Sequence, residues 1–212
     1  LENTYNHSLS ELNSTEISNL KQRDRDRYQE YQTFVDLDRD GQLSPSEINT
    51  RDALKILHNA GITIVDDTAD GSRGSGLMHH KFIIIDDRVI ITGSANFTSS
   101  DFFGDFNNPE SRGNANNLIE IHNPQLANLF TEEFNLMWGD GWGGQFDSKF
   151  GLQKPLRDSQ QIIVGNSVVE VHFSPTSSTI PWYLSSNGLI ARTLDIAETE
   201  IDLALFVFSE QN

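Results

Sequence analysis

One short stretch of the chain carries the side-chain types that phosphoryl transfer uses. An imidazole, an ammonium, a carboxylate, a hydroxyl and a carboxamide fall within eighteen residues, at His79, Lys81, Asp86, Ser94 and Asn96. A lysine charge with neutral donors beside it suits a phosphate whose equatorial oxygens gain charge in the transition state. Histidine can attack or donate a proton near neutral pH because its unperturbed pKa is about 6.5. Such groups can cleave a phosphate ester without a metal ion.

A buried strand must hold the first of these groups. Residues 78–85 are apolar apart from His79, His80 and Lys81, and they include three isoleucines, which predicts a strand buried on both faces. Side chains at positions i and i+2 of a strand share a face. We therefore expect His79 and Lys81 to point one way and His80 the other, where it would be structural.

A hairpin is expected to bring the remaining groups back to the same place. Residues 86–88 form a polar turn, and residues 89–92 read as a second short strand that ends at Gly93. This pairing would return Ser94 and Asn96 to the start of the first strand. Glycine at position 93 would let the backbone approach the site closely.

The complete string reads H-x-K-x4-D-x6-G-S-x-N, and it resembles the signature of the phospholipase D superfamily at every fixed position. The resemblance implies that His79 is the nucleophile or the general acid and base. It further implies that Lys81 and Asn96 bind the phosphate with help from Ser94, and that Asp86 supports the site without touching the substrate. The reaction of the family passes through a covalent phosphohistidine and uses no metal ion.

That family places two H-x-K motifs in each active site, whereas this sequence holds one. His172 is no substitute, because Phe173 and Ser174 follow it and supply no lysine two positions on. The second motif is therefore expected from the rest of the parent chain or from the partner in a homodimer. Taken alone, H-x-K also fits a surface pair at the mouth of a strand, but the full string is far more specific.

A second motif lies upstream, where residues 36–47 match the twelve-residue EF-hand calcium loop. Six of its residues would supply calcium ligands, namely Asp36, Asp38, Asp40, Gln42 (through its carbonyl), Ser44 and Glu47. Predicted helices flank the loop, at residues 25–35 and 45–60. The alternative is a solvated acidic turn. Because EF-hands usually pair and no second loop is present in the sequence, a structural Ca²⁺ is favoured over a sensor.

Composition bounds the partners and the compartment. A formal charge of −16 disfavours a protein that holds duplex DNA through its phosphates, and it also disfavours simple docking on anionic lipid. No run approaches twenty apolar residues, so no transmembrane segment is expected. The absence of cysteine excludes disulfides and thiolate zinc sites. The compartment stays unassigned, with the calcium loop leaning toward an extracytoplasmic one.

The order of predicted elements favours an α/β fold, a phospholipase D-like α/β/α sandwich with a mixed sheet plus an EF-hand helix-loop-helix. Besides the hairpin, strands are predicted at 62–65 and 118–121, and a helix begins at Asn123-Pro124 and ends near Trp138. The polar stretch 101–117 would overhang the site as a substrate loop. The resemblance covers about residues 50–140.

Four segments follow from this pattern. They are a helical segment with the calcium loop (1–60), the catalytic-motif part (61–140), a linker with little structure (141–167) and the start of a second phospholipase D-like half (168–212). In the last segment we expect a strand at 168–175, a helix at 187–197 and a strand at 201–209.

Two functional classes fit these observations. The first is a phospholipase D-type phosphodiesterase acting on a phospholipid, with an endonuclease of the same superfamily as its alternative. The second is a calcium-stabilised binding module without activity. Hydrolysis at the calcium loop itself is disfavoured, because an EF-hand saturates its ion with protein oxygens.

Overall fold

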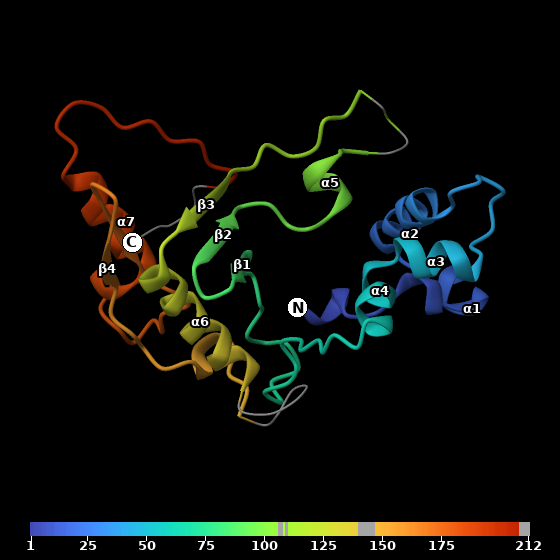
Figure 1. Ribbon diagram of the computed structural model, residues 1–212, viewed down its shortest axis with the longest axis horizontal. Helices are drawn as coiled ribbons and strands as arrows, with labels where there is room; N and C mark the ends of the chain where they lie inside the picture. Colours follow the sequence, from blue (N-terminus) through green and yellow to red (C-terminus); the bar gives the residue numbers. More distant parts are fainter. Residues whose placement is uncertain (106–107, 109, 140–146, 208–212) are drawn as a thin grey trace. The chain divides into compact units, whose positions relative to one another are not determined.

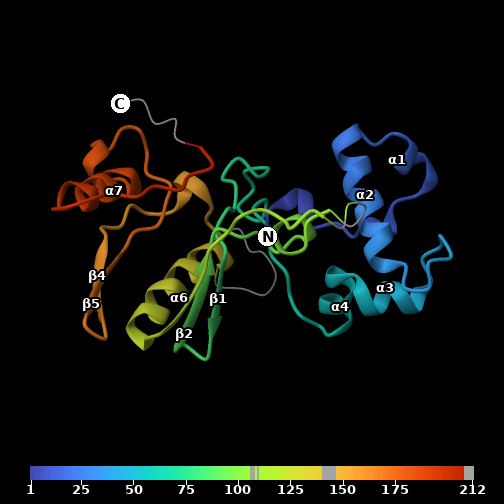
Figure 2. The ribbon, with the colours of Figure 1, turned by 90° about the horizontal axis from the view of Figure 1, so that it is seen from above.

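The computed structural model describes residues 1–105, 108, 110–139 and 147–207, and the chain divides into two units, residues 1–154 and 155–212. The division falls inside the segment predicted as a linker. Figure 1 shows the elements in chain order, and Figure 2 shows them from above. No helix in the described part of the chain is long and apolar enough to cross a membrane.

The first sixty residues of unit 1 are helical. Two 3-10 turns, η1 (Asn3–Tyr5) and η2 (Leu9–Glu11), precede α1 (Ser14–Ser18) and α2 (Gln22–Val35). α1 begins at a capping box. The Asn13 side chain accepts a hydrogen bond from the backbone N–H of Glu16, and the Glu16 side chain accepts one from the backbone N–H of Asn13.

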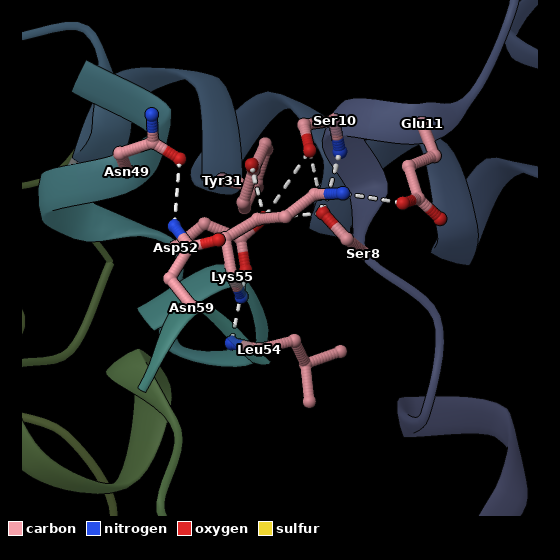
Figure 3. A network of polar contacts seen from close by, with 9 residues as sticks. All are labelled: Ser8, Ser10, Glu11, Tyr31, Asn49, Asp52, Leu54, Lys55 and Asn59. Carbon is pink, nitrogen blue, oxygen red and sulfur yellow. Dashed lines mark hydrogen bonds and ion pairs between the residues drawn. The ribbon is translucent and has the colours of Figure 1, made fainter. Parts of the chain in front are cut away.

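The single helix predicted at 45–60 is two helices, α3 (Pro45–Arg51) and α4 (Ala53–Asn59). Asp52 ends the first and caps the second, because its Oδ1 accepts from the backbone N–H groups of Leu54 and Lys55 at 3.0 and 3.2 Å. Its Oδ2 also accepts from the Tyr31 hydroxyl at 2.7 Å and from the Ser8 hydroxyl. As Figure 3 shows, one buried carboxylate ties the N-terminal turns to α2 and α4.

The catalytic-motif part contains a three-stranded sheet. Its strands are β1 (Phe82–Ile85), β2 (Val89–Gly93) and β3 (Leu118–His122), in the order β1-β2-β3, with the short helix α5 (Ser99–Phe102) between the last two in sequence. Both pairings are antiparallel, with Ile84 opposite Ile90 and Ile90 opposite Ile121. The prediction of a mixed sheet is therefore wrong for the described residues, because each strand here follows its neighbour through a hairpin or a returning loop.

The remaining predicted strand of this part, at 62–65, is also wrong. A strand forms only where a neighbour supplies its hydrogen bonds, and this segment is irregular and pairs with none of β1, β2 or β3. Ile62 is 54% exposed. Apolar, β-branched composition alone did not distinguish an unpaired extended segment from a strand.

α6 (Pro124–Trp138) packs against β1 and β2, as both views show. Asn123 caps it and Pro124 occupies its first turn, as predicted. Its buried residues include Leu126, Ala127 and Phe130, and the Phe130 ring meets the ring of Phe82 edge to face at 5.1 Å. This contact and the fully buried Ile90 form the core under the motif.

The sheet is covered by a helix on one face only in the described residues, so the predicted double burial of β1 is wrong. Phe82 and Ile84 lie on the face toward α6, whereas Ile83 and Ile85 point the other way and are 39% and 41% exposed. The observed layers are a helix and a sheet rather than a complete α/β/α sandwich. A strand that is apolar on both faces is typical of a sheet with a packed layer on each side, but the described residues place a helix against one face only.

The segment predicted as a linker with little structure contains η3 (Gly151–Gln153), within unit 1, and β4 (Gln160–Val164), within unit 2. β4 pairs antiparallel with β5 (Ser167–Val171), which begins at the edge of the predicted strand 168–175. The 3-10 turn η4 (Trp182–Leu184) and α7 (Ser186–Asp195) follow, in agreement with the predicted helix.

The last predicted strand, at 201–209, is not found. Residues 201–207 are irregular, and residues 208 and 209 lie outside the described part of the chain. The alternating pattern of Ile201, Leu203 and Leu205 is exposed, since no neighbouring strand pairs with it in unit 2.

Candidate active site

The hairpin β1–β2 returns the end of the motif to its beginning. The Thr92 hydroxyl donates to the carbonyl of Lys81 at 2.9 Å, and the Gly93 N–H reaches the same carbonyl at 3.4 Å. A Cβ on Gly93 would lie 2.1 Å from the carbonyl oxygen of Asn117, so only glycine fits there. The segment that follows Gly93 therefore starts beside Lys81, as the sequence predicted.

His79 and Lys81 lie next to one another at the open end of the hairpin. Lys81 Nζ donates to the carbonyl of His79 at 2.7 Å. Burial, the Lys81 charge and His80 together lower the pKa of His79 below its ordinary value, so the neutral imidazole is favoured near pH 7. Burial lowers the pKa of Lys81 as well, and the charge of Asp101 opposes that effect.

Ser94 and Asn96 are held by a loop that returns toward β3. The Ser94 hydroxyl donates to Asn116 Oδ1 at 2.8 Å and accepts from the Asn117 N–H at 3.0 Å. The backbone N–H of Asn96 donates to Asp101 Oδ2 at 2.6 Å. The polar stretch predicted to overhang the site thus binds the motif directly, and Asp101, Asn114 and Asn116 are functional candidates that the motif alone did not indicate.

Asp86 is the motif residue that the structure separates from the others. Asp86 and Asp87 form the tip of the hairpin, both with φ of 51°, and the Arg88 N–H closes the turn on the carbonyl of Ile85 at 3.0 Å. Asp86 lies five positions beyond Lys81 along extended chain, about 16 Å at ~3.3 Å per residue. In this chain Asp86 therefore lies in the turn at the far end of β1 from Lys81, and its supporting role in the site stays a prediction.

His80 lies toward α6, although the strand predicted at 78–85 covers only 82–85 and His79, His80 and Lys81 precede it. Its ring lies 5.9 Å from that of Phe82, the residue two positions on, and both line a cavity of about 150 Å³ together with Met78 and Met137. His80 Nε2 lies 2.8 Å from Glu133 Oε1, and Lys154 Nζ forms an ion pair with the same oxygen. No sequence pattern indicated this buried group, because its three members are far apart in the chain.

The candidate calcium loop joins α2 and α3. Oxygens of Asp36, Asp38 and Asp40 lie within 4.8 Å of one another, and Gly41 adopts a φ of 82°, as a sharp turn requires. Asp36 accepts from the N–H groups of Asp40 and Gly41 at 3.2 and 2.9 Å. Three of the six predicted ligand residues are thus gathered.

The other two side-chain ligands, Ser44 and Glu47, form the capping box of α3. Glu47 is 7% exposed; its Oε2 accepts from the N–H and hydroxyl of Ser44 at 2.8 and 2.6 Å, and its Oε1 accepts from the N–H of Leu37 at 2.7 Å. These hydrogen bonds lower the pKa of Glu47 to about 2, and the bonds from Ser44 have the largest effect. The carboxylate therefore lies against the loop backbone, while Gln42 is exposed in the loop.

His172, which the sequence excluded from the motif, lies in unit 2. Its Nδ1 is 2.8 Å from the hydroxyl of Ser186 at the start of α7, and burial is the main cause of its lowered pKa. No lysine or asparagine pair of the kind found around His79 accompanies it in the described residues of that unit.

Comparison with known families decides the identity of the fold. A family described as "Cardiolipin synthase, PLD-like domain" matches residues 13–138, more than half of the chain. The chain belongs to this family. The PLD-like match includes the whole hairpin, the returning loop and α6, and it also includes the candidate calcium loop.

Curated relatives of this PLD-like domain carry one name. The human protein called mitochondrial cardiolipin hydrolase is 35% identical over 85 residues, which are 40% of this chain and 28% of that protein. The proteins of the same name from Mus musculus and Danio rerio are 34% identical over 85 residues and 29% identical over 89 residues, covering 32% and 34% of their lengths. The chain spans about a third of the length of the curated relatives it matches. No solved structure gives a significant match.

Proposed function

We propose that this chain supplies one histidine–lysine half of the active site of a phospholipase D-type phosphodiesterase whose substrate is a phospholipid. The observation that carries the proposal is the closure of the hairpin on Lys81, which brings His79, Lys81 and the Ser94–Asn96 segment to one end of the sheet. An imidazole with a lowered pKa, an ammonium and two neutral donors at one place match the demands of phosphoryl transfer.

In the proposed reaction, the neutral imidazole of His79 attacks the phosphorus atom of the diester. A nitrogen–phosphorus bond forms, the bond from phosphorus to the leaving alcohol breaks, and a histidine of the second motif protonates the leaving oxygen. Water then attacks phosphorus while the histidine of the second motif takes its proton, the nitrogen–phosphorus bond breaks, and a phosphomonoester leaves. Lys81, Ser94 and Asn96 stabilise the charge on the non-bridging oxygens during both steps. No metal ion takes part.

The second motif comes, in this proposal, from the rest of the parent protein or from a homodimer mate. The described residues hold one H-x-K motif, at His79, and the family needs two. An experiment on the reaction must therefore use the full-length parent protein. Analytical ultracentrifugation of that protein distinguishes the two sources, since a monomer with full activity excludes the dimer.

A lipid substrate is supported by the name of the relatives, cardiolipin hydrolase, and by the charge of the chain. A net charge of −16 opposes the counterion release that usually drives binding to nucleic acid. Cardiolipin is itself anionic, so the phosphate must be met by local charge at Lys81 rather than by the field of the whole chain.

The decisive comparison uses full-length protein in EDTA with three substrates, namely vesicles of phosphatidylcholine, vesicles that contain cardiolipin, and single-stranded DNA. Hydrolysis of either lipid without hydrolysis of DNA supports the proposal. Cleavage of DNA alone would make the protein an endonuclease of the same superfamily, and no turnover of any substrate would favour the inactive calcium-stabilised module.

We also propose that the loop 36–47 binds one structural Ca²⁺. The clustered carboxylates of Asp36, Asp38 and Asp40 and the sharp turn at Gly41 support this, since carboxylates in such proximity repel one another without a cation. The carbonyl of Gln42, the Ser44 side chain and Glu47 would complete the ligand set. The ion would hold α2 and α3 together and would take no part in the phosphoryl chemistry.

A further inference from the structure

Asp101 occupies a central place in the hydrogen bonding of the candidate site. It belongs to α5, five residues beyond Asn96 and outside the H-x-K-x4-D-x6-G-S-x-N string. Its Oδ2 accepts from the backbone N–H of Asn96 at 2.6 Å, and its Oδ1 accepts from Asn114 Nδ2 at 2.6 Å. Both bonds are short, as expected when the acceptor is ionised.

The asparagine held by Asp101 is itself bonded to a further member of the site, because Asn116 Nδ2 donates to the carbonyl of Asn114 at 3.2 Å. Burial would raise the pKa of Asp101, but the bonds from Asn114 and Asn96, with the nearby side chain of Asn116, hold that pKa below its ordinary value. Asn116 in turn accepts from the Ser94 hydroxyl. Asp101 is therefore connected to both neutral donors of the proposed phosphate site, directly to the backbone of Asn96 and through Asn114 and Asn116 to Ser94.

Asp101 also joins the two arms of the loop that leaves and re-enters the site. The Asn114 N–H donates to the carbonyl of Ser100 at 3.0 Å, and the Asp105 N–H donates to the Ser111 hydroxyl at 2.9 Å, so the outgoing and returning arms lie side by side. Asn114 Nδ2 on Asp101 extends this pairing to the motif. Without the carboxylate, the Asn96 N–H would lose its acceptor at the point where the chain leaves the hairpin.

We infer that Asp101 is a positioning residue for phosphate binding, which fixes Asn96 and the Asn114–Asn116 arm beside Lys81 so that the donors are in place before substrate arrives. Donors that are already oriented need no reorganisation when charge develops on the phosphate. The inference rests on the proposed function for its consequence in turnover, but the ordering of Asn96 by Asp101 is a property of the fold alone.

The charge of Asp101 has a second effect, on Lys81. The titratable groups that face Lys81 in the described residues are His79 and Asp101; the charge of Asp101 favours the protonated amine, whereas burial disfavours it. Removal of the Asp101 charge should therefore lower the pKa of Lys81 further, so that the amine loses its proton at a lower pH. A residue that only shapes the loop would not shift this titration.

The test compares Asp101→Ala and Asp101→Asn with Asp105→Asn in the full-length protein. Asp105→Asn removes a charge from the same arm and leaves the bonds to Asn96 and Asn114 in place. Hydrogen exchange of a peptide that contains Asn96 is measured by mass spectrometry, and the affinity for inorganic phosphate is measured by calorimetry as a function of pH. Thermal unfolding reports whether each variant is folded.

We expect exchange at Asn96 to become about 10- to 100-fold faster in Asp101→Ala, as the loss of a charged hydrogen bond predicts. Phosphate affinity should fall by a similar factor. The pH above which this affinity declines, as Lys81 loses its proton, should be lower in Asp101→Asn than in the wild type and unchanged in Asp105→Asn. In turnover, KM should rise more than kcat falls. Unchanged exchange and unchanged phosphate affinity in a folded Asp101→Ala protein would overturn the inference.

Failure of the proposed function gives a different result. If neither the wild type nor any variant hydrolyses a phosphodiester, the phosphodiesterase proposal is wrong. The exchange rate at Asn96 and its dependence on Asp101 can still be measured in that case. Faster exchange in Asp101→Ala with no change in phosphate affinity would also overturn the inference, since Asp101 would then order the loop without preparing an anion site.

Discussion

Glu133 of α6 and His80 of the motif segment lie 2.8 Å apart, Oε1 to Nε2, and the Glu133 side chain is fully buried. His80 is the residue between His79 and Lys81, so this contact attaches the backbone of the candidate catalytic pair to the helix behind the sheet. Lys154 pairs with the same carboxylate oxygen and is 7% exposed. A buried ionic group thus underlies the site on the face opposite to the chemistry.

Removal of the buried carboxylate should destabilise the protein strongly. Glu133→Ala removes the carboxylate that pairs with the buried Lys154 ammonium and that hydrogen-bonds to His80, and breaking a buried pair in this way typically costs about 3–5 kcal/mol. The measurement is urea denaturation of the full-length protein. Glu132→Ala is the matched control, because Glu132 is exposed on the same helix and pairs only with Asn128 among the bonds resolved here. Equal losses in the two variants would refute the role of Glu133.

The same carboxylate predicts an acid limit to stability. Burial would raise the pKa of Glu133, but the hydrogen bonds from His80 and Lys154 and the Lys154 charge lower it from 4.5 to about 2. Because the folded-state pKa lies below the unfolded one, the stabilisation is complete above about pH 4.5 and is lost as the pH falls toward 2. Thermal unfolding between pH 6 and 2 should show a smaller acid loss in Glu133→Gln than in the wild type. Parallel curves would contradict this account.

The candidate nucleophile should titrate below its ordinary range. Burial, the Lys81 charge and His80 all lower the pKa of His79 from 6.5. Nuclear magnetic resonance of the histidine side chains gives this value directly, and Lys81→Met should move it back upward because one of the positive neighbours is gone. His122, which is exposed and pairs with Glu120, serves as the internal reference. A pKa for His79 at or above 6.5 in the wild type would exclude the lowered value.

Calcium should stabilise the helical segment. Addition of Ca²⁺ to metal-free protein is expected to release heat of binding and to raise the melting temperature, because the ion removes the repulsion among Asp36, Asp38 and Asp40. Asp38→Asn should weaken the binding, whereas Asp24→Asn, an equal charge change in the first turn of α2, should not. An absence of both heat and thermal shift up to millimolar Ca²⁺ would exclude the site. Hydrolysis of a phosphodiester should not depend on the ion.

The sequence predicted those parts of the structure that local chemistry determines. α6 has its cap, its first-turn proline and its apolar spacing within fifteen residues, and it was found with its predicted limits. The hairpin and the return of Ser94 and Asn96 to Lys81 followed from two strands and a short turn. These elements need no knowledge of distant residues.

The predictions that were wrong or incomplete concern features whose structure depends on residues far away in the sequence. The segment 62–65 has strand composition, but strand pairing requires a neighbour. At Asp52, besides its local capping bonds, the side chains of Tyr31 and Ser8 from distant parts of the sequence also bind the carboxylate. Glu133 and Lys154 join His80 across 53 and 74 residues of sequence. The turn at Asp86 was predicted and its left-handed backbone confirms it, whereas the supporting role that the motif resemblance implies for Asp86 stays a prediction. Asp101 was noticed only as part of a polar loop.

The central claim is that His79 performs metal-free phosphodiester hydrolysis, and one measurement tests it most directly. Full-length protein, His79→Ala and the control His122→Ala are incubated with a chromogenic phosphodiester in EDTA, with thermal unfolding as the check on folding. We predict turnover by the wild type and by His122→Ala, and a loss of at least about 1,000-fold in folded His79→Ala, as expected when a nucleophile is removed. Equal turnover by His79→Ala, or wild-type activity that vanishes in EDTA and returns with a metal ion, would contradict the account.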